Sequence, residues 1–438
     1  MEKLAIFGGE PAIKNPPKEL FKWPIITEED EKAYLEVLRH NKFSGTDITE
    51  KFQAEFAQWI GSEYALAFCN GTMSLAAAMF AIGLSAGDEI ICTTKTYWAS
   101  IVPAATFGAV PVFCNIDDNL SMDPDDIERC ITEKTKAIMV VHYLAYPCDM
   151  DRIMAIAKKH NLLVIEDVSH AQGGLYKGKR LGTFGDVAAM SLMSTKSFAA
   201  GELGVLVTDK RRYYERAIAY AHYERNNPNV ITESDELKGY HSIALGGVKG
   251  RANQACSALA RVQLKYYDER CAEIRKAMNY FWDLLEGVKG IHPIRVDEAT
   301  GSNMAGWYCP HGIYCAEELG GLSVKRFCEA LRAEGVESWD GGNYCLHNHN
   351  FFKTFNLMNL DKPSRIAFSE RDARQEDEYC NPSNEVGCFS VPWFIHCDKE
   401  WIEKYAAAFR KVAEGYKELL ENDSKSNQGG RWYGFTND

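Results

Sequence analysis

A lysine that follows an apolar strand is the residue of this chain best placed to do covalent chemistry. Lys196 comes shortly after the segment 186–192, which has the length and composition of a strand, and small residues and glycines fill 199–204. Lysine is seldom buried in a folded protein unless it is paired or takes part in chemistry. A lysine of lowered pKa can form a Schiff base with a carbonyl compound.

An aspartate at the end of another predicted strand precedes this lysine in the chain. The aliphatic run 162–165 is closed by Glu166 and Asp167. Such a run is long enough for a buried parallel strand and too short for a helix. Asp167 would then lie at the carboxyl end of the strand, where open α/β sheets bind their ligands. The segment between Asp167 and Lys196 is long enough for one hairpin or crossover, so both side chains can reach one pocket.

A lysine and a carboxylate in one pocket are what the cofactor pyridoxal 5′-phosphate (PLP) requires. The lysine forms the Schiff base, and the carboxylate pairs with the ring nitrogen. Spacing alone is equally consistent with Lys196 in a surface loop and Asp167 in a turn at the end of a strand. The catalytic pair is therefore a hypothesis that needs support from other motifs.

A candidate phosphate site lies earlier in the chain. The predicted strand 64–69 is followed by Asn70, Gly71 and Thr72 and then by an alanine-rich helix over 73–82. This arrangement binds phosphate, because free N–H groups at a helix N-terminus point at the anion and the Thr72 hydroxyl adds a donor. An ordinary strand-to-helix turn has the same pattern and is the commoner case.

The order and spacing of these motifs resemble those of the DegT/DnrJ/StrS aminotransferases. The matching segments are Glu-Asp-Val-Ser-His-Ala at 166–171, Gly185-Asp186, Ser-Leu-Met-Ser-Thr-Lys at 191–196, and Gly-Glu-Leu-Gly at 201–204. Members of this family are fold-type I PLP enzymes that aminate keto-sugars and keto-cyclitols. The resemblance covers about residues 1–420. One departure is Leu203, where glycine is commoner in the family.

The resemblance implies a role for each of several residues. Lys196 would bind the cofactor, and Asp167 would pair with its ring nitrogen. The phosphate of PLP would be contacted by Gly71, Thr72 and Ser191, and by Lys249 from the partner subunit. Tyr97 would stack on the ring face, and His170 would contact the 3′-oxygen. A cation such as Lys249 suits a phosphate, since charge-assisted hydrogen bonds are the stronger class. Without the resemblance, Tyr97 would be assigned to core packing and Lys249 to a solvated basic turn.

Strand and helix patterns alternate along the first half of the chain. This alternation predicts an α/β fold with a mostly parallel sheet between helices, and the less regular later elements predict a smaller α+β domain. The resemblance implies the fold-type I aminotransferase architecture. Helices are expected over about 253–265 and 266–286. The expected divisions are an N-terminal arm at 1–25, a large PLP-binding domain at 26–265, a small C-terminal domain at 266–422 and a flexible tail at 423–438.

Composition narrows the class of protein. The 438 residues are 46% hydrophobic and 25% charged, as in ordinary globular proteins, and the formal net charge of −12 argues against nucleic acid or an anionic membrane as partner. The 14 cysteines show no metal-type pairing, and no apolar run has the length of a membrane span. His347 and His349 form a His-x-His pair without an evident set of further ligands, so no metal is expected. We expect a cytoplasmic enzyme with reduced thiols.

The predicted function is the transfer of an amino group from glutamine or glutamate to a keto-cyclitol or keto-sugar, with or without a nucleotide on the acceptor. The resemblance implies a homodimer with shared active sites. Two alternatives use the same cofactor: a dehydratase that resembles aminohydroxybenzoate synthases, and a PLP-binding regulator without catalysis. A nicotinamide-dependent oxidoreductase would need Gly-x-Gly-x-x-Gly after the first strand, and residues 70–73 lack it.

Overall fold

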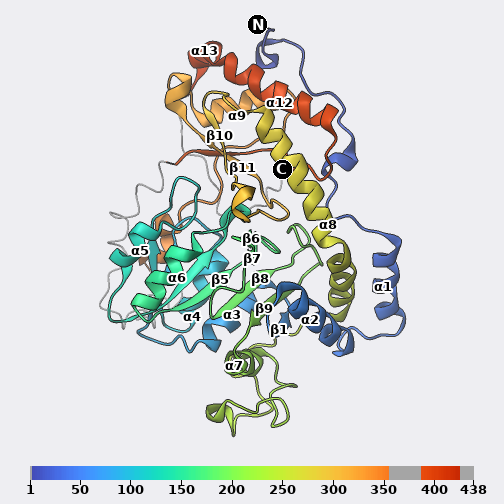
Figure 1. Cartoon of the computed structure of the whole chain (residues 1–438), viewed down its shortest axis with the longest axis vertical. Coiled ribbons are helices and arrows are strands. Elements are labelled where there is room, and N and C mark those ends of the chain that lie inside the picture. Colours follow the sequence, from blue (N-terminus) through green and yellow to red (C-terminus); the bar gives the residue numbers. More distant parts are fainter. Residues whose placement is uncertain (1, 355–385, 425–438) are drawn as a thin grey trace.

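A seven-stranded sheet forms the centre of the molecule (Figure 1). The computed structural model describes residues 2–354 and 386–424, so the predicted tail lies outside the described residues beyond Ser424. In spatial order the strands are β1 (Tyr64–Phe68), β9 (Gly204–Thr208), β8 (Val187–Ser191), β5 (Leu163–Asp167), β4 (Thr135–Val141), β2 (Glu89–Thr93) and β3 (Val110–Cys114).

The strands of this sheet run in parallel except at β9, which is antiparallel to both of its neighbours. The prediction of a mostly parallel sheet is confirmed. Parallel strands have their carboxyl ends at one edge, so β5 delivers Asp167 and β8 delivers Ser191 to the same place. The antiparallel β9 begins at that edge, where Gly204 pairs with Ser191.

Helices cover both faces of the sheet, as expected where buried strands alternate with helices. Helix α3 is apolar on every side and almost wholly buried, because it lies between α7 and strands β8 and β9. The helices of this part are α1 (Glu28–Arg39), α2 (Asp47–Ile60), α3 (Gly71–Ala81), α4 (Val102–Thr106), α5 (Pro124–Cys130), α6 (Met150–Lys159) and α7 (Arg211–Ala221).

One long helix leads from the large sheet to the C-terminal elements. The two helices expected over 253–265 and 266–286 are a single helix, α8 (Gln254–Leu284), so that part of the prediction is wrong. Its 31 residues contain neither glycine nor proline, and at 1.5 Å per residue they span about 46 Å. The predicted domain boundary at 265/266 therefore falls inside a continuous helix, and the division itself stays a prediction.

The C-terminal elements pack around a small antiparallel sheet at the top of Figure 1. Its strands are β10 (Ile291–Pro293), β11 (His311–Tyr314) and β12 (Cys388–Ser390). A separate two-stranded sheet consists of β6 (Leu175–Tyr176) and β7 (Lys179–Arg180). The helices are α9 (Val324–Ala333), α10 (Asn350–Thr354), α12 (Lys399–Glu414) and α13 (Tyr416–Leu419). Helix α12 packs on both α8 and α9, and α9 in turn contacts β12 of the small sheet. The small sheet is therefore connected to the long helix through α9 and α12.

The N-terminal arm is irregular apart from two short 3-10 turns, as its proline and glycine content predicts. It does more than lie over the surface, because Leu4, Ile13 and Leu20 are buried. The Trp23 indole N–H donates to the carbonyl oxygen of Lys196 at 2.8 Å, so the arm reaches the segment that carries the predicted catalytic lysine. Among the described helices, none has the length and apolarity needed to cross a bilayer.

Candidate active site

Seven of the eight predicted cofactor-binding residues line one cavity of about 270 Å³ at the carboxyl edge of the large sheet. Each of them comes from a strand end or from the loop or helix that follows, as the sheet order requires. The predicted residues that line the cavity are Gly71, Thr72, Tyr97, Asp167, His170, Ser191 and Lys196.

Lys196 is buried in the loop between β8 and β9, with 9% of its surface exposed. Burial lowers the pKa of its amine from 10.5 to about 8, although Cys309 and Asp167 act in the opposite direction. Its Nζ lies 4.2 Å from the centroid of the Tyr308 ring. A lysine with this pKa has a substantial neutral fraction near physiological pH, which is the form that attacks a carbonyl.

Asp167 is held in place by hydrogen bonds to both of its carboxylate oxygens. The Ser100 hydroxyl donates to Oδ2 at 2.7 Å, and the backbone N–H of Ser169 donates to Oδ1 at 3.0 Å. The side chain is 3% exposed and still lines the cavity. Sequence reasoning missed Ser100, whose role depends on the folding of the 96–100 segment against β5 rather than on any local motif.

The start of α3 forms a cradle beside Ser191. The Asn70 side chain accepts from Met73 N at 2.8 Å and its carbonyl accepts from Ser74 N, whereas the N–H groups of Gly71 and Thr72 have no acceptor within the helix. A Cβ on Gly71 would lie 2.6 Å from Cβ of Ser191, so only glycine permits this approach. Helix N–H groups and hydroxyls thus line the cavity where an anion can bind.

His170 presents one defined tautomer to the cavity. Its Nδ1 accepts from the backbone N–H of Leu144 at 3.2 Å, which assigns the ring proton of the neutral imidazole to Nε2. Burial, with the charges of Lys196 and His311, holds the pKa of His170 well below its ordinary value. His170 is therefore a neutral N–H donor, which suits a contact to an oxygen.

These groups form a donor set that fits PLP. An amine of lowered pKa, a hydrogen-bonded carboxylate, a neutral imidazole and a helix N-terminus with hydroxyls all face one cavity. Tyr97, which is 38% exposed, lines the same cavity and offers an aromatic ring face.

A second cavity of about 580 Å³ adjoins the first and shares Tyr97, His170, Met193 and Lys196 with it. Its walls come from both parts of the chain and include five tyrosine or tryptophan rings. The rings are those of Tyr97, Tyr143, Tyr308, Trp339 and Trp393. Sequence reasoning did not find these last four residues, because they come from segments with no motif of their own. A molecule in this second cavity has direct access to the Lys196 amine.

Lys249 differs from the other predicted site residues because it does not line the cavity of its own chain. It is exposed, and its Nζ lies 5.5 Å from the Tyr223 ring centroid. The next residue, Gly250, accepts a hydrogen bond from Cys69 N at 2.8 Å, which holds this segment beside the β1–α3 corner. Its expected action from a partner subunit stays a prediction.

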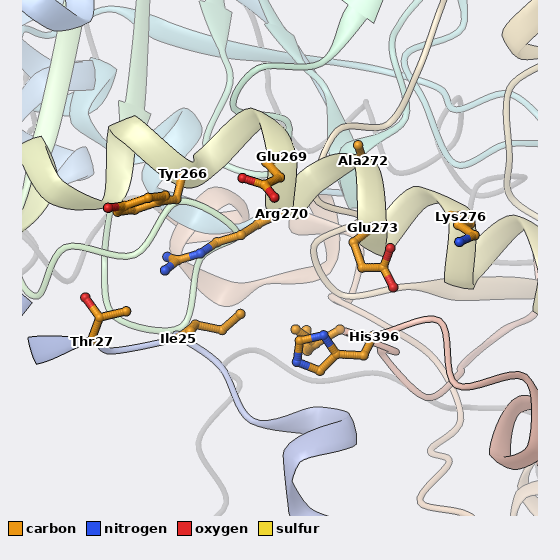
Figure 2. A pocket seen from close by; sticks show the side chains of 10 residues that line it. Ile25, Thr27, Tyr266, Glu269, Arg270, Ala272, Glu273, Lys276 and His396 are labelled. Atoms are coloured by element: carbon orange, nitrogen blue, oxygen red, sulfur yellow. The ribbon is translucent and has the colours of Figure 1, made fainter.

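A separate surface cleft of about 570 Å³ lies between α8 and the N-terminal arm. Figure 2 shows Tyr266, Arg270 and Lys276 of α8 on one side and Ile25 and His396 on the other. It shares no lining residue with the two cavities described above. This cleft is therefore distinct from the predicted active site.

Comparison with known proteins agrees with this geometry. Residues 24–365 match the DegT/DnrJ/EryC1/StrS aminotransferase family. The chain is 32% identical over 401 residues to a Micromonospora echinospora protein named as an L-glutamine:3-amino-2,3-dideoxy-scyllo-inosose aminotransferase, covering 90% of this chain and 92% of the relative. It is 34% identical over 271 residues to GDP-perosamine synthase of Escherichia coli O157:H7, covering 61% and 72%.

Solved structures show the same fold. An aminotransferase from Psychrobacter cryohalolentis superposes with a TM-score of 0.74 at 28% identity, covering 91% of this chain and all of that one. A 3-amino-5-hydroxybenzoic acid synthase superposes with a TM-score of 0.75 at 22% identity, covering 93% and 100%, and at that identity it supports the fold alone. With the family match across most of the chain, these findings establish that the protein belongs to the DegT/DnrJ/EryC1/StrS family and is a PLP-dependent aminotransferase.

Proposed function

We propose that this enzyme moves an amino group from glutamine or glutamate to a keto-cyclitol or a keto-sugar. The single observation that carries this proposal is that Lys196 lies where the cofactor cavity meets a second, aromatic cavity large enough for a ring-shaped acceptor. The names of the relatives support the substrate class. One is named for an L-glutamine donor and an inosose acceptor, and another, from Aneurinibacillus thermoaerophilus, as a dTDP-3-amino-3,6-dideoxy-α-D-galactopyranose transaminase.

The roles proposed for the residues follow from their settings. When bound, PLP supplies an electron sink for the carbanion formed at the α-carbon of the amino donor. Lys196 would hold the cofactor, and its Nζ would take the proton from the donor's α-carbon in the first half-reaction and supply a proton to the former carbonyl carbon of the acceptor in the second, a task that suits an amine with a pKa of about 8. Asp167 keeps the ring nitrogen protonated. The contacts proposed to orient the cofactor are Gly71, Thr72 and Ser191 at the phosphate, Tyr97 on the ring and His170 at the 3′-oxygen.

The reaction can be tested in two halves on the purified enzyme with PLP. Glutamine or glutamate is expected to bleach the visible absorbance of the bound cofactor, and a keto-cyclitol or keto-sugar is expected to restore it. A dehydratase would release a dehydrated product with no aminated acceptor, and a regulator would show neither change. Mass spectrometry of the products identifies the aminated acceptor, and its absence from a full panel of both classes would refute the proposal.

We also propose that the enzyme is a homodimer in which Lys249 contacts the phosphate of the partner's cofactor. Support comes from the position of Lys249, which is exposed beside the β1–α3 corner and outside its own cavity. The Lys249→Ala variant is expected to bind PLP about 10- to 100-fold more weakly, because a charge-assisted hydrogen bond is lost. Equilibrium titration with PLP measures this change.

A hybrid dimer gives the decisive readout for Lys249. Co-expression of Lys249→Ala and Lys196→Ala chains with different tags yields a dimer in which one site carries both changes and the other carries neither. At limiting PLP, such a dimer is expected to regain about half of the wild-type activity. A hybrid no more active than its two parents would contradict the shared site.

The described cysteines are free thiols, which supports a reducing compartment, and we propose the cytoplasm as the location.

A further inference from the structure

A histidine, a cysteine and a glutamate meet at one end of the small sheet. His292 Nε2, Cys315 Sγ and a carboxylate oxygen of Glu318 all lie within 4.8 Å of one another. The three side chains are exposed or half-buried, so an ion can reach them from solvent. None of these three described residues lines the cofactor cavity or the second cavity beside it. The cluster is therefore separate from the active site.

The fold brings these residues together from segments that share no sequence motif. His292 on β10 pairs with Ile313 on β11, and Cys315 follows two residues later, so its side chain lies on the same face of the ladder. The backbone N–H of Cys315 donates to the carbonyl oxygen of Gly290 at 3.0 Å, which continues the pairing to this point. Glu318 lies in the 3-10 turn that begins after Cys315, where residues three apart lie on the same side.

An imidazole nitrogen, a thiolate sulfur and a carboxylate oxygen are the ligands that zinc prefers in proteins. With metal–ligand distances of about 2.0–2.3 Å, neighbouring ligand atoms of a tetrahedral site lie about 3.3–3.6 Å apart. His292 Nε2 and Glu318 Oε1 are 3.1 Å apart, which is close to that spacing. A side-chain shift of about 1 Å brings the Cys315 sulfur to the same spacing. Glu317 Oε2 lies 3.3 Å from Cys315 Sγ and is within reach of the fourth position.

The charges of the cluster also favour a cation. The backbone N–H of Glu318 lowers the pKa of Cys315, but burial and the carboxylates of Glu317 and Glu318 outweigh it and raise that pKa above its ordinary value. A bound dication has the opposite effect, since coordination deprotonates a thiol. The backbone N–H of Gly290 donates to Glu318 Oε2 at 2.7 Å, which turns Oε1 toward His292. Hydrogen bonds of this kind orient the ligands of metal sites.

A second cluster of the same size has no place for a cation. Cys114, Asp126 and Cys130 also lie within 4.8 Å of one another. The guanidinium of Arg129, however, donates to both carboxylate oxygens of Asp126, at 2.6 and 2.8 Å, and the backbone N–H of Asn115 donates to one of them at 2.8 Å. The arginine already supplies the positive charge there.

From the donor set and its geometry we infer that His292, Cys315 and Glu318 bind one zinc ion per chain outside the active site. The ion links β10 to the segment after β11 and so stabilises the small sheet. A metal that binds only the folded protein adds its binding free energy to the free energy of unfolding. The rate of amino transfer is expected to stay unchanged, because the ligands lie outside both cavities.

Zinc binding to the reduced, tag-free holoenzyme tests the inference. Equilibrium dialysis followed by elemental analysis is expected to find about one zinc ion per chain, with a Kd of about 1 μM or below. Cys315→Ser and His292→Ala are each expected to weaken binding about 100-fold, because a metal ligand is lost. Cys397→Ser removes another half-buried thiol, outside the cluster, and is expected to leave binding unchanged.

Thermal unfolding gives a second readout. Zinc is expected to raise the Tm of the wild-type holoenzyme by about 3 °C and to leave the Tm of Cys315→Ser unchanged. Absence of zinc from the wild-type protein at about 100 μM metal would overturn the inference. Wild-type affinity in both Cys315→Ser and His292→Ala would overturn it too, and so would a loss of the ion in Cys130→Ser instead, which would place the metal at the other cluster.

Discussion

Replacing Lys196 by alanine is expected to lower the rate of amino transfer by about 10⁴-fold or more and to remove the visible absorbance of the covalently held cofactor. The side chain has two tasks, a covalent bond to the cofactor and proton transfer at the α-carbon, and alanine can do neither. PLP is expected to remain bound through the cradle at Gly71 and Ser191, because those contacts do not involve the lysine. Stopped-flow absorbance with glutamine measures the loss.

Controls separate chemistry from structure in this experiment. Lys196→Arg keeps a cation of similar length but offers no nucleophilic amine at neutral pH, so it is expected to be as inactive as Lys196→Ala. Lys158→Ala, at the exposed end of α6, is expected to have no effect. Added methylamine is expected to restore part of the activity of Lys196→Ala, since it replaces the missing base. Turnover near the wild-type rate in Lys196→Ala would refute the assignment.

The buried setting of Lys196 also predicts a pH dependence. The neutral amine is the nucleophile, and burial lowers the pKa of the amine from 10.5 to about 8. Below pH 8 the amine is mostly protonated, so capture of added PLP by the cofactor-free protein is slow. The rate is expected to rise with pH and to level off above about pH 8. A midpoint near 10 would mean that the lysine is solvated before the cofactor arrives.

The sequence could predict the position of Asp167 because this residue closes a short apolar run, and such a run indicates where a buried strand ends. The role of Ser191, which lies in the next predicted strand, comes from the family resemblance. Once both strands were placed in a parallel sheet, their carboxyl ends had to meet. Local pattern left the Gly71–Thr72 segment open between a phosphate site and an ordinary turn, and the resemblance favoured the phosphate site. Its close approach to Ser191 explains why glycine stands at position 71. Local pattern thus placed the strand ends that line the cavity, whereas the roles of the predicted cofactor-binding residues rest on the family resemblance.

The other half of the site depends on contacts between distant segments. Tyr308 and Trp393 belong to loops with no periodic pattern, and only the packing of the small sheet brings them to Lys196. Trp23 is a similar case, because a proline-rich arm predicts irregular structure but not an indole that donates to the Lys196 carbonyl. The continuous α8 was divided in the prediction at 265/266, where the sequence contains no residue that ends a helix.

The Asp167→Asn variant is expected to lower the rate of the glutamine half-reaction about 10³-fold while the protein stays folded. Asparagine has the shape of aspartate but no charge, so it cannot hold the cofactor's ring nitrogen in its protonated form. The local hydrogen bonds can persist, because Ser169 N can still donate to the amide oxygen and the Ser100 hydroxyl can rotate to accept from the amide nitrogen. Circular dichroism checks the fold, and stopped-flow absorbance measures the rate.

Two further measurements show whether Asp167 acts through its charge. Ser100→Ala leaves the carboxylate charged but removes its hydroxyl donor, so a loss of only about tenfold is expected. The charge of Asp167 raises the pKa of Lys196, so Asp167→Asn is expected to move the midpoint for PLP capture below pH 8. A structural role would leave that midpoint in place. If Asp167→Asn and Ser100→Ala lost activity equally, with no shift of the midpoint, the carboxylate would be a packing group and the ring nitrogen would need another partner.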